Sequence, residues 1–358
     1  MTDTDVHDLR PEPPRVLSPG DPGWDAARAT FNLLTDQRPD AIALPSDAPG
    51  VAAAIVIARE RGLRVTAQAT GHGAGSLRSL DGTMLVNTSH LTEVAIDAEA
   101  RRVRVGAGVR WRDVTAPLST LGLAALHGSS PDVGIVGYSL GGGMGWLARE
   151  HGLQCNAVRA IELVTADGRM LRVDAEHDAE LSWALRGGGG SFGIVTALEF
   201  EVVPVRELTA GSLFFPVERT ADVLRAWTDL LPSLPDALTS WVTILHFPPF
   251  DDVPVDFRGR SFAIVMAAHL GPELDARVLL QPVLDFTLSF PSMALAADEV
   301  LVPRADLDWY YRTYAGGRCD FRDGLVTGVE QINRNACGCR DQNDGAGTDE
   351  QGAYLLAD

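Results

Sequence analysis

The sequence predicts an α+β fold in two domains, and three observations support this prediction. The chain has 358 residues, of which 46% are hydrophobic, so it is long enough for two domains with sizeable cores. Strand and helix patterns alternate along the chain as far as Pro204. Beyond it, alternating strand patterns at 241–247 and 261–269 accompany a helical pattern at 220–231, which indicates a second α+β domain.

A strand–helix–strand unit opens the first domain. The apolar run at 41–45 precedes Asp47, which supplies N-terminal capping chemistry for a helix that Gly62 ends. The stretch 64–69 predicts a second strand, which runs directly into Thr-Gly-His-Gly-Ala-Gly-Ser at 70–76. A glycine-rich loop therefore leaves the end of a strand.

Further elements follow from the same patterns. We expect short strands at 83–87 and 103–105 and a helix at 111–121. Later in the domain we expect a strand at 158–165, a hairpin turn with its partner at 170–173, a helix at 178–185 and a long strand at 193–203.

The segment 134–147 has a glycine density that an ordinary helix would not tolerate, because each interior glycine costs about 1 kcal/mol. Something must approach its backbone closely. That partner is either a ligand or a second backbone that packs against it.

A third glycine-rich segment, 188–193, matches the spacing G-x-G-x-x-G of dinucleotide-binding folds. That fingerprint follows a strand and opens a helix, whereas this segment follows a predicted helix and opens a predicted strand. No glycine loop is followed by Gly-Lys-Ser/Thr, so a P-loop is excluded as well. The sequence thus predicts neither a Rossmann site nor a P-loop.

Composition excludes several function classes. A formal net charge of -18 disfavours nucleic acid as a partner, because nucleic-acid binders neutralise phosphates with clustered basic residues. No apolar stretch is long enough for a membrane span, and residues 1–15 are polar and acidic, unlike a secretory signal. We therefore expect a cytoplasmic protein without a membrane partner.

The four cysteines are too few and too unevenly spaced for a disulfide framework, and they fit a reducing compartment. They are Cys155, Cys319, Cys337 and Cys339. The last two form a C-x-C pair without a second pair at zinc-finger spacing, so we expect no metal site.

The glycine-rich stretches 68–77 and 140–147 together carry a resemblance to a known family. Further matches lie at 39–42, 164–168 and 186–196. The chain resembles the FAD-linked flavoprotein oxidases of the vanillyl-alcohol-oxidase superfamily, in particular the berberine-bridge-enzyme-like branch. Each motif alone is weak, but their combination is specific.

The resemblance implies a two-subdomain FAD-binding domain of the PCMH type, followed by an incomplete α+β substrate domain. Residues 1–35 are then an N-terminal extension with a first helix, 36–205 the FAD-binding domain and 206–315 the substrate domain. The segment 316–358 loses apolar periodicity and is rich in Gly, Asp and Cys, so we expect it to be atypical and without order. Relatives are longer, and a truncated or altered carboxyl terminus is the corresponding expectation.

FAD is the cofactor that the resemblance implies, with the loop at 70–77 around its pyrophosphate. The expected cofactor residues of this loop are Thr70, Gly71, His72, Gly73, Ala74, Gly75, Ser76 and Leu77. Those expected from later segments are Gly128, Ser130, Val133, Gly134, Ser139, Gly142, Gly143, Gly145 and Val195. We expect Gly143 to face the cofactor.

His72 matches the family histidine that carries the flavin through its 8α-methyl carbon. The chemistry is also plausible from the residues alone, since a neutral imidazole nitrogen held close to an electrophilic carbon adds to it. The alternative is a loop histidine that hydrogen-bonds backbone or water. Some relatives add a cysteinyl link in a Cys-Pro-Thr-Val-Gly segment, but the matching residue here is Ser130, so a single link is expected.

The expected function is an FAD-dependent oxidase or dehydrogenase. Hydride passes from a small-molecule C–H next to oxygen or nitrogen to the flavin, and O2 reoxidises the flavin to give H2O2. Two alternatives remain open: a flavin-binding fragment without turnover, and nucleotide binding without redox chemistry. The catalytic base and the substrate are not assigned, and either a monomer or a homodimer is compatible with the sequence.

Overall fold

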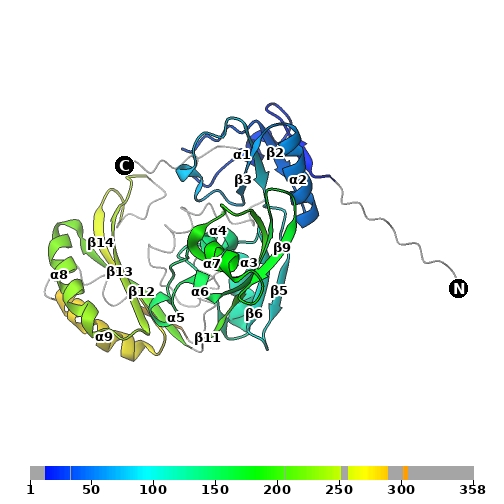
Figure 1. The fold of residues 1–358 in the computed structure, drawn as a ribbon. Helices are drawn as coiled ribbons and strands as arrows, with labels where there is room; N and C mark the ends of the chain where they lie inside the picture. The colour runs from blue at the N-terminus through cyan, green and yellow to red at the C-terminus, as the bar shows by residue number, and fades with distance from the viewer. Residues whose placement is uncertain (1–12, 33, 206, 251–256, 289–300, 305–358) are drawn as a thin grey trace, which may run out of the picture.

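The computed structural model describes residues 13–32, 34–205, 207–250, 257–288 and 301–304. These residues form three larger sheets and one two-stranded sheet with their helices, arranged as two packed subdomains and a third α+β layer (Figure 1).

The first subdomain is built on a four-stranded sheet with the order β1-β2-β4-β3. Its strands are β1 (Arg15–Leu17), β2 (Ala41–Leu44), β3 (Arg64–Gln68) and β4 (Thr83–Asn87). β2 and β3 both run parallel to β4, and all five residues of β4 are buried, as expected for a parallel strand covered on both faces. The helices are α1 (Trp24–Arg28) and α2 (Ala48–Glu60). Asp47 caps α2 by accepting a 2.7 Å hydrogen bond from the Gly50 N–H.

The second subdomain is an antiparallel five-stranded sheet with the order β5-β6-β10-β8-β9. Its strands are β5 (Val94–Asp97), β6 (Arg102–Gly106), β8 (Val158–Val164), β9 (Met170–Asp174) and β10 (Ile194–Glu201). Its helices are α3 (Trp111–Thr120), α4 (Ile135–Leu140), α5 (Ala148–His151), α6 (Gln154–Ala157) and α7 (Ala179–Gly188). Two short strands, β7 (Leu123–Ala124) and β11 (Val203–Pro204), pair with each other at the exit from this subdomain.

One hydrophobic core joins the two subdomains. Val86 of the first sheet, Ile55 of α2, and Val105 and Leu198 of the second sheet belong to the same buried cluster, together with the fully buried Trp111 of α3. The two sheets are therefore held together by shared apolar packing, which fixes the position of any site between them.

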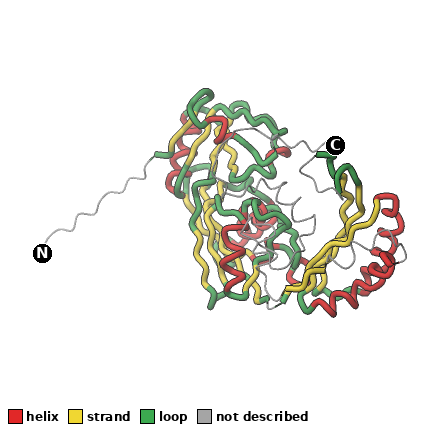
Figure 2. The backbone as a smooth tube through the Cα atoms, turned by 180° about the vertical axis from the view of Figure 1, so that it is seen from behind, coloured by secondary structure: helices red, strands yellow, loops and turns green. Residues whose placement is uncertain are grey.

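The third layer is a sheet with the order β13-β14-β12-β15, covered on its outer face by two helices (Figure 2). Its strands are β12 (Leu208–Pro216), β13 (Leu238–His246), β14 (Ser261–His269) and β15 (Leu301–Arg304). The helices are α8 (Thr220–Leu230) and α9 (Glu273–Leu288), with the single 3-10 turns η2 (Val217–Arg219) and η3 (Leu231–Ser233) beside α8. Trp241 of β13 packs against Trp146 of the second subdomain with ring centroids 3.8 Å apart, which ties the layer to the rest of the molecule.

The predicted α+β fold is confirmed, and the strand–helix–strand unit lies where the sequence indicates it. One local prediction is wrong: Ile135–Leu140 forms a short helix despite its glycine density. The helix is possible because it contains one glycine, Gly137, and ends at Gly141, where the remaining glycines begin. The segment 316–358, with the Cys337/Cys339 pair, lies outside the described residues. In the part of the chain that the structure describes, no helix is long and apolar enough to cross a membrane.

Candidate cofactor site

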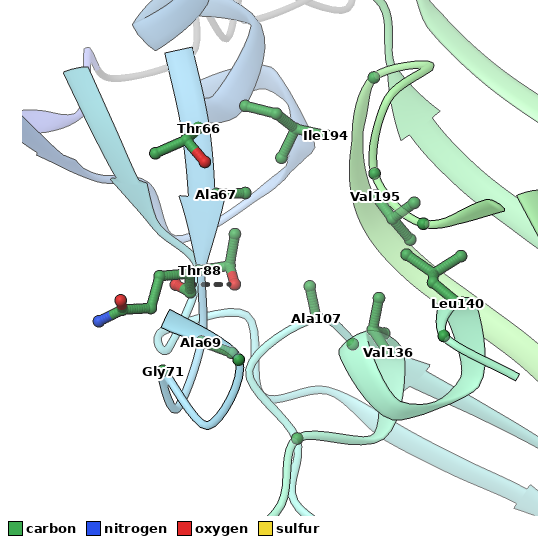
Figure 3. Close-up of a pocket in the computed structure, with 18 of the residues that line it drawn as sticks. Thr66, Ala67, Ala69, Gly71, Thr88, Ala107, Val136, Leu140, Ile194 and Val195 are labelled. Carbon is green, nitrogen blue, oxygen red and sulfur yellow. Dashed lines mark hydrogen bonds between the residues drawn. The ribbon is translucent and has the colours of Figure 1, made fainter. Parts of the chain in front are cut away.

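A cavity of about 670 Å³ lies between the first subdomain and the second. This volume is in the range of small-molecule and cofactor sites. In Figure 3 one wall carries Thr66, Ala67 and Ala69 of β3 and the segment that follows it. The opposite wall carries Ala107, Val136, Leu140, Ile194 and Val195.

The loop after β3 forms one end of the cavity. Its lining residues are Thr70, Gly71, His72, Gly73, Ala74 and Leu77. The turn η1 (Ala74–Ser76) closes the loop through hydrogen bonds from the N–H groups of Ala74 and Ser76 to the carbonyls of Gly71 and Gly73. No described residue accepts a hydrogen bond from the N–H groups of Gly71, His72 or Gly73. These groups are thus available to a ligand that carries acceptor oxygens, such as a pyrophosphate.

The imidazole of His72 is held at its edge and on one face. Its Nδ1 lies 2.8 Å from Oγ1 of Thr70, and its ring stacks on that of Phe31 with centroids 3.9 Å apart and planes 16° apart. Its Nε2 is screened from solvent and has no hydrogen-bond partner among the described residues. A buried nitrogen in this state costs about 1–3 kcal/mol unless a ligand engages it.

Burial lowers the pKa of His72 below its usual value of 6.5, and the nearby Arg110 guanidinium lowers it further. The imidazole is therefore neutral at pH 7, and one ring nitrogen keeps a free lone pair. A neutral histidine is the form that acts as a nucleophile.

The segment between α1 and β2 packs directly on this loop. Gly71 has a φ of +74°, and a Cβ at this position would lie 2.9 Å from Cα of Thr30. Only glycine permits this approach. The Phe31 N–H donates a hydrogen bond to the Thr70 carbonyl at 3.2 Å, so the segment and the loop are joined through their backbones.

The opposite wall includes residues of a glycine-rich segment that the sequence analysis did not assign to the cofactor. Gly189, Gly190, Ser191, Phe192, Gly193 and Ile194 line the cavity, beside the expected Val195. The segment follows α7 and opens β10, so it is not a Rossmann fingerprint, yet it borders the same cavity. Its glycine spacing was a usable signal, but only the sheet pairing of β10 brings it opposite the His72 loop.

The start of α4 completes this wall, and Val133 and Gly134 line the cavity as expected. A Cβ on Gly134 would lie 3.6 Å from both Ala69 Cβ and Thr70 Oγ1. The second glycine-rich segment therefore begins in contact with the His72 loop. Tyr138, Leu140 and Gly141 also line the cavity and carry no earlier assignment.

Eight of the expected cofactor residues lie outside the cavity lining. They are Gly75, Ser76, Gly128, Ser130, Ser139, Gly142, Gly143 and Gly145. The hydroxyls of Ser76 and Ser139 donate to the carbonyls of Gly73 and Ile135, each at 2.8 Å, so these side chains serve the local backbone.

The glycines after α4 face protein atoms instead of the cavity. A Cβ on Gly143 would lie 2.5 Å from Cε1 of Tyr138, and one on Gly145 would lie 2.0 Å from the His127 carbonyl oxygen. A Cβ on Gly128 would also meet the Tyr138 ring, at 2.9 Å. Gly143 thus packs against Tyr138, and the glycines enclose this ring.

Tyr138 and His127 are unsuited to proton transfer as the structure holds them. The Tyr138 hydroxyl donates to the Leu126 carbonyl at 3.1 Å, and burial raises the pKa of Tyr138 well above its usual value. Burial lowers the pKa of His127 to about 4, and its Nδ1 lies 2.7 Å from the Gly128 carbonyl oxygen. Both side chains are neutral across the physiological range.

The lining is therefore apolar and backbone-rich, with His72 as its one titratable residue apart from Tyr138 among the described positions. These features fit FAD: loop N–H groups without an acceptor among the described residues suit its pyrophosphate, and apolar walls suit its rings. His72 Nε2, which is buried and has no hydrogen-bond partner among those residues, is placed at the same site. Within the described residues, no group of His, Cys, Asp and Glu could hold a metal ion.

Comparison with known proteins agrees with this fit. A family model described as an FAD binding domain matches residues 39–174. The chain is 32% identical over 257 residues to (R)-6-hydroxynicotine oxidase from Paenarthrobacter nicotinovorans, covering 72% of this chain and 55% of that protein. It is 34% identical over 189 residues to glucooligosaccharide oxidase from Sarocladium strictum, covering 52% of this chain and 38% of that protein. The chain thus spans about half the length of the curated relatives it matches.

Solved structures show the same fold. The 6-hydroxy-D-nicotine oxidase of Arthrobacter nicotinovorans aligns with a TM-score of 0.73 and 25% identity, covering 88% of this chain and 67% of that one. A glucooligosaccharide oxidase from Acremonium strictum, described as carrying a 6-S-cysteinyl, 8α-N1-histidyl FAD, aligns with a TM-score of 0.69 and 25% identity. That alignment covers 85% of this chain and 61% of the other.

Proposed function

This chain belongs to the FAD-linked oxidases of the vanillyl-alcohol-oxidase superfamily, and we propose that it holds FAD covalently through His72 and oxidises a small molecule with it. The substrate would lose hydride from a C–H bond next to oxygen or nitrogen. Dioxygen would then reoxidise the flavin and form hydrogen peroxide. The relatives named above are oxidases of a nicotine derivative and of oligosaccharides, so cyclic amines and sugars are the two candidate substrate classes.

The observation that supports this proposal most directly is the state of His72. Its imidazole is neutral, is fixed in the cavity wall and has one buried nitrogen without a hydrogen-bond partner in the described part of the chain. A flavin bound there would supply the electrophilic 8α-carbon and the hydride-accepting ring. The protein contributes the nucleophile, the main-chain donors at Gly71 and Gly73, and walls that are largely apolar.

Acid precipitation tests the covalent link. Purified protein is denatured with acid, and the pellet is washed and examined for flavin absorbance. We expect a yellow pellet from the wild type and a colourless one from His72→Ala, whose loop backbone can still bind FAD non-covalently. A colourless wild-type pellet would contradict the covalent link.

A second candidate function is flavin binding without turnover. It is favoured by the cavity lining, because the described lining residues offer no carboxylate, and the Tyr138 hydroxyl is hydrogen-bonded with a raised pKa. A proton acceptor for substrate oxidation is thus not evident in this part of the chain. Hydrogen peroxide measurement with panels of sugars and cyclic amines separates the two candidates. Peroxide formation supports the oxidase, whereas reproducible absence of turnover in protein with full flavin occupancy supports the second candidate.

A further inference from the structure

One edge of the sheet in the third layer is formed by β13, which pairs with β14 along all nine of its residues and with no other described strand. At one end of this ladder the Leu270 N–H donates to the Ala237 carbonyl at 2.9 Å. At the other end the Phe247 N–H donates to the Arg260 carbonyl, also at 2.9 Å. Bonded pairs alternate along antiparallel strands, so the odd-numbered residues of β13 bond to β14. Its even-numbered residues direct their N–H and C=O groups to the free edge.

β13 differs from the other edge strands of the three larger sheets. Those strands are β1, β3, β5, β9 and β15, and each has three to five residues and at least one charged side chain. β13 has nine residues and contains no Asp, Glu, Lys, Arg or Pro. Short length, charge and proline are the features that keep an exposed strand edge from pairing with another chain. Because β13 has none of them, its free edge is suited to pairing.

Apolar side chains accompany this edge. Ile244 is 48% exposed and Leu245 is 36% exposed, and as neighbours in a strand they lie on opposite faces of the sheet. On the helix side, the indole N–H of Trp227 donates to Ser240 Oγ at 3.0 Å, so this side of α8 lies against β13. Leu224, three residues before Trp227, is on the same side of α8 and is 37% exposed. A strand added to the edge would therefore cover apolar surface as well as main-chain groups.

Charge restricts where two copies of this chain can meet. The formal net charge is -18, so much of the surface of one copy repels that of another. β13 carries no acidic side chain, so an antiparallel pair of β13 strands places no like charges opposite each other. With Val242 opposite its own copy, Ser240 of one strand lies opposite Ile244 of the other, and the outward N–H and C=O groups of these residues are paired. The edge is thus self-complementary in hydrogen bonding and in charge.

From these observations we propose that β13 pairs antiparallel with β13 of a second copy of this chain, which joins the two four-stranded sheets into one. Each copy uses the same edge, so the assembly has two-fold symmetry and closes as a dimer. The flavin cavity is lined by described residues within 55–195 and by none of the third layer, so pairing at β13 leaves it unobstructed.

Light scattering coupled to size-exclusion chromatography measures the mass of the full chain over a dilution series. We expect the wild type to have twice the chain mass at the upper concentrations. Ile244→Pro removes an outward N–H and leaves the bonds to β14 intact, and Ile244→Lys places a charge at the edge. Both variants should show half the wild-type mass. The matched control is Val278→Lys on α9, which places the same lysine at a side chain that is 66% exposed and should remain dimeric.

Far-ultraviolet circular dichroism shows whether the variants are folded. A wild type that stays monomeric throughout the dilution series, or folded Ile244 variants that stay dimeric, would overturn the proposal. A mass that keeps rising with concentration would also overturn it, because the two-fold pair leaves no free edge at β13. So would recovery of a different polypeptide bound to the wild type in place of the second copy.

Amide hydrogen exchange of the wild type gives a test that depends on no variant. Exchange in the segment 238–246 is followed by mass spectrometry at high and at low protein concentration. We expect it to become faster on dilution, whereas exchange in β12, which is paired on both sides within the sheet, stays constant. Unchanged exchange at 238–246 across a dilution that halves the mass would place the dimer interface elsewhere and overturn the proposal.

Discussion

The loop at 70–77 and the segment at 141–145 are both rich in glycine, yet their glycines have different surroundings. Gly73 lines the cavity, and apart from its chain neighbours no described residue has an atom within 4 Å of the position that a Cβ would take. Gly145 lies outside the lining, and its Cβ would fall 2.0 Å from a backbone oxygen. The first loop keeps space for a ligand at Gly73, although Gly71 of the same loop packs closely on Thr30, whereas the second segment lets protein groups pack closely at Gly143 and Gly145.

The difference shows that a high glycine density indicates a close approach to the backbone, but does not indicate whether a ligand or another protein group makes that approach. At 141–145 the neighbouring groups are the Tyr138 ring and the carbonyl of His127. The segment therefore packs against Tyr138, a residue that lines the cavity. At 70–77 the backbone is left open on the cavity side. An alanine substitution should therefore act on stability at Gly145 and on cofactor binding at Gly73.

The largest effect is expected for Gly145→Ala. The added methyl group would overlap the His127 carbonyl, and the backbone must move to relieve the overlap. We expect a loss of about 3 kcal/mol or more in the free energy of unfolding, and a melting temperature lower by roughly 6–12 °C. Thermal unfolding followed by circular dichroism measures it. An unchanged melting temperature would show that the segment is not tightly packed.

A comparable effect is expected from pH through His127, which lies under the same segment. Its pKa is lowered to about 4 in the folded protein. Between this value and the usual value of 6.5, the histidine is protonated in the unfolded chain and neutral in the folded one. Stability is then fully present above about pH 6.5 and declines as pH falls towards 4, by up to about 3 kcal/mol.

His127→Gln should remove this part of the pH dependence. Denaturant titrations between pH 4 and about pH 7 compare the slope of stability against pH in the two proteins. The control is His90→Gln, because His90 lies at an exposed position. A slope that His127→Gln leaves unchanged would assign the acid sensitivity to other groups.

Gly73→Ala is expected to act on the cofactor. Gly73 has a φ of -92°, which alanine adopts readily, and its surroundings are open, so stability of the apoprotein should change by less than about 0.5 kcal/mol. The methyl group enters the space next to the free N–H groups and should weaken FAD binding several-fold. Flavin occupancy after purification, normalised to folded protein, is the measurement. Full occupancy would place the cofactor away from this part of the loop.

The smallest effect on flavin binding is expected for Gly168→Ala in the turn between β8 and β9. Its φ of +86° disfavours alanine by about 1 kcal/mol, but the nearest atom to the added methyl group is 3.8 Å away. Flavin occupancy should stay at the wild-type level. A loss of flavin here would mean that destabilisation alone releases the cofactor, and would weaken the interpretation of Gly73→Ala.

Local signals in the sequence were enough to predict the elements that end at the site. The strand at 41–44, the capped helix from Ala48 and the strand at 64–68 each have their own periodicity and punctuation, so the loop after them is placed as well. The lowered pKa of His72 and the contact with Phe31 could not be predicted in this way. The first depends on burial of the imidazole and on the charge of Arg110, and the second on the packing of the segment around Thr30 on Gly71, and no local pattern encodes these contacts.

Pairing between distant strands was also beyond local patterns. β6 and β10 are adjacent in the sheet although about 90 residues separate them, and this pairing brings 189–195 to the cavity. The glycines at 142–145 were assigned to the cofactor because their spacing matches a family motif. Tertiary structure decides whether a glycine faces a ligand or a neighbouring ring, and here Gly143 faces the Tyr138 ring.

The most direct test of the central claim is to locate the flavin in the chain. Trypsin should cleave after Arg64 and Arg78, and the resulting peptide 65–78 contains His72 as its one histidine and has no cysteine. Mass spectrometry of the flavin-fluorescent peptide from acid-precipitated protein identifies it without ambiguity. We predict that peptide 65–78 carries the flavin. Recovery of this peptide unmodified from protein that retains acid-stable flavin would contradict the account.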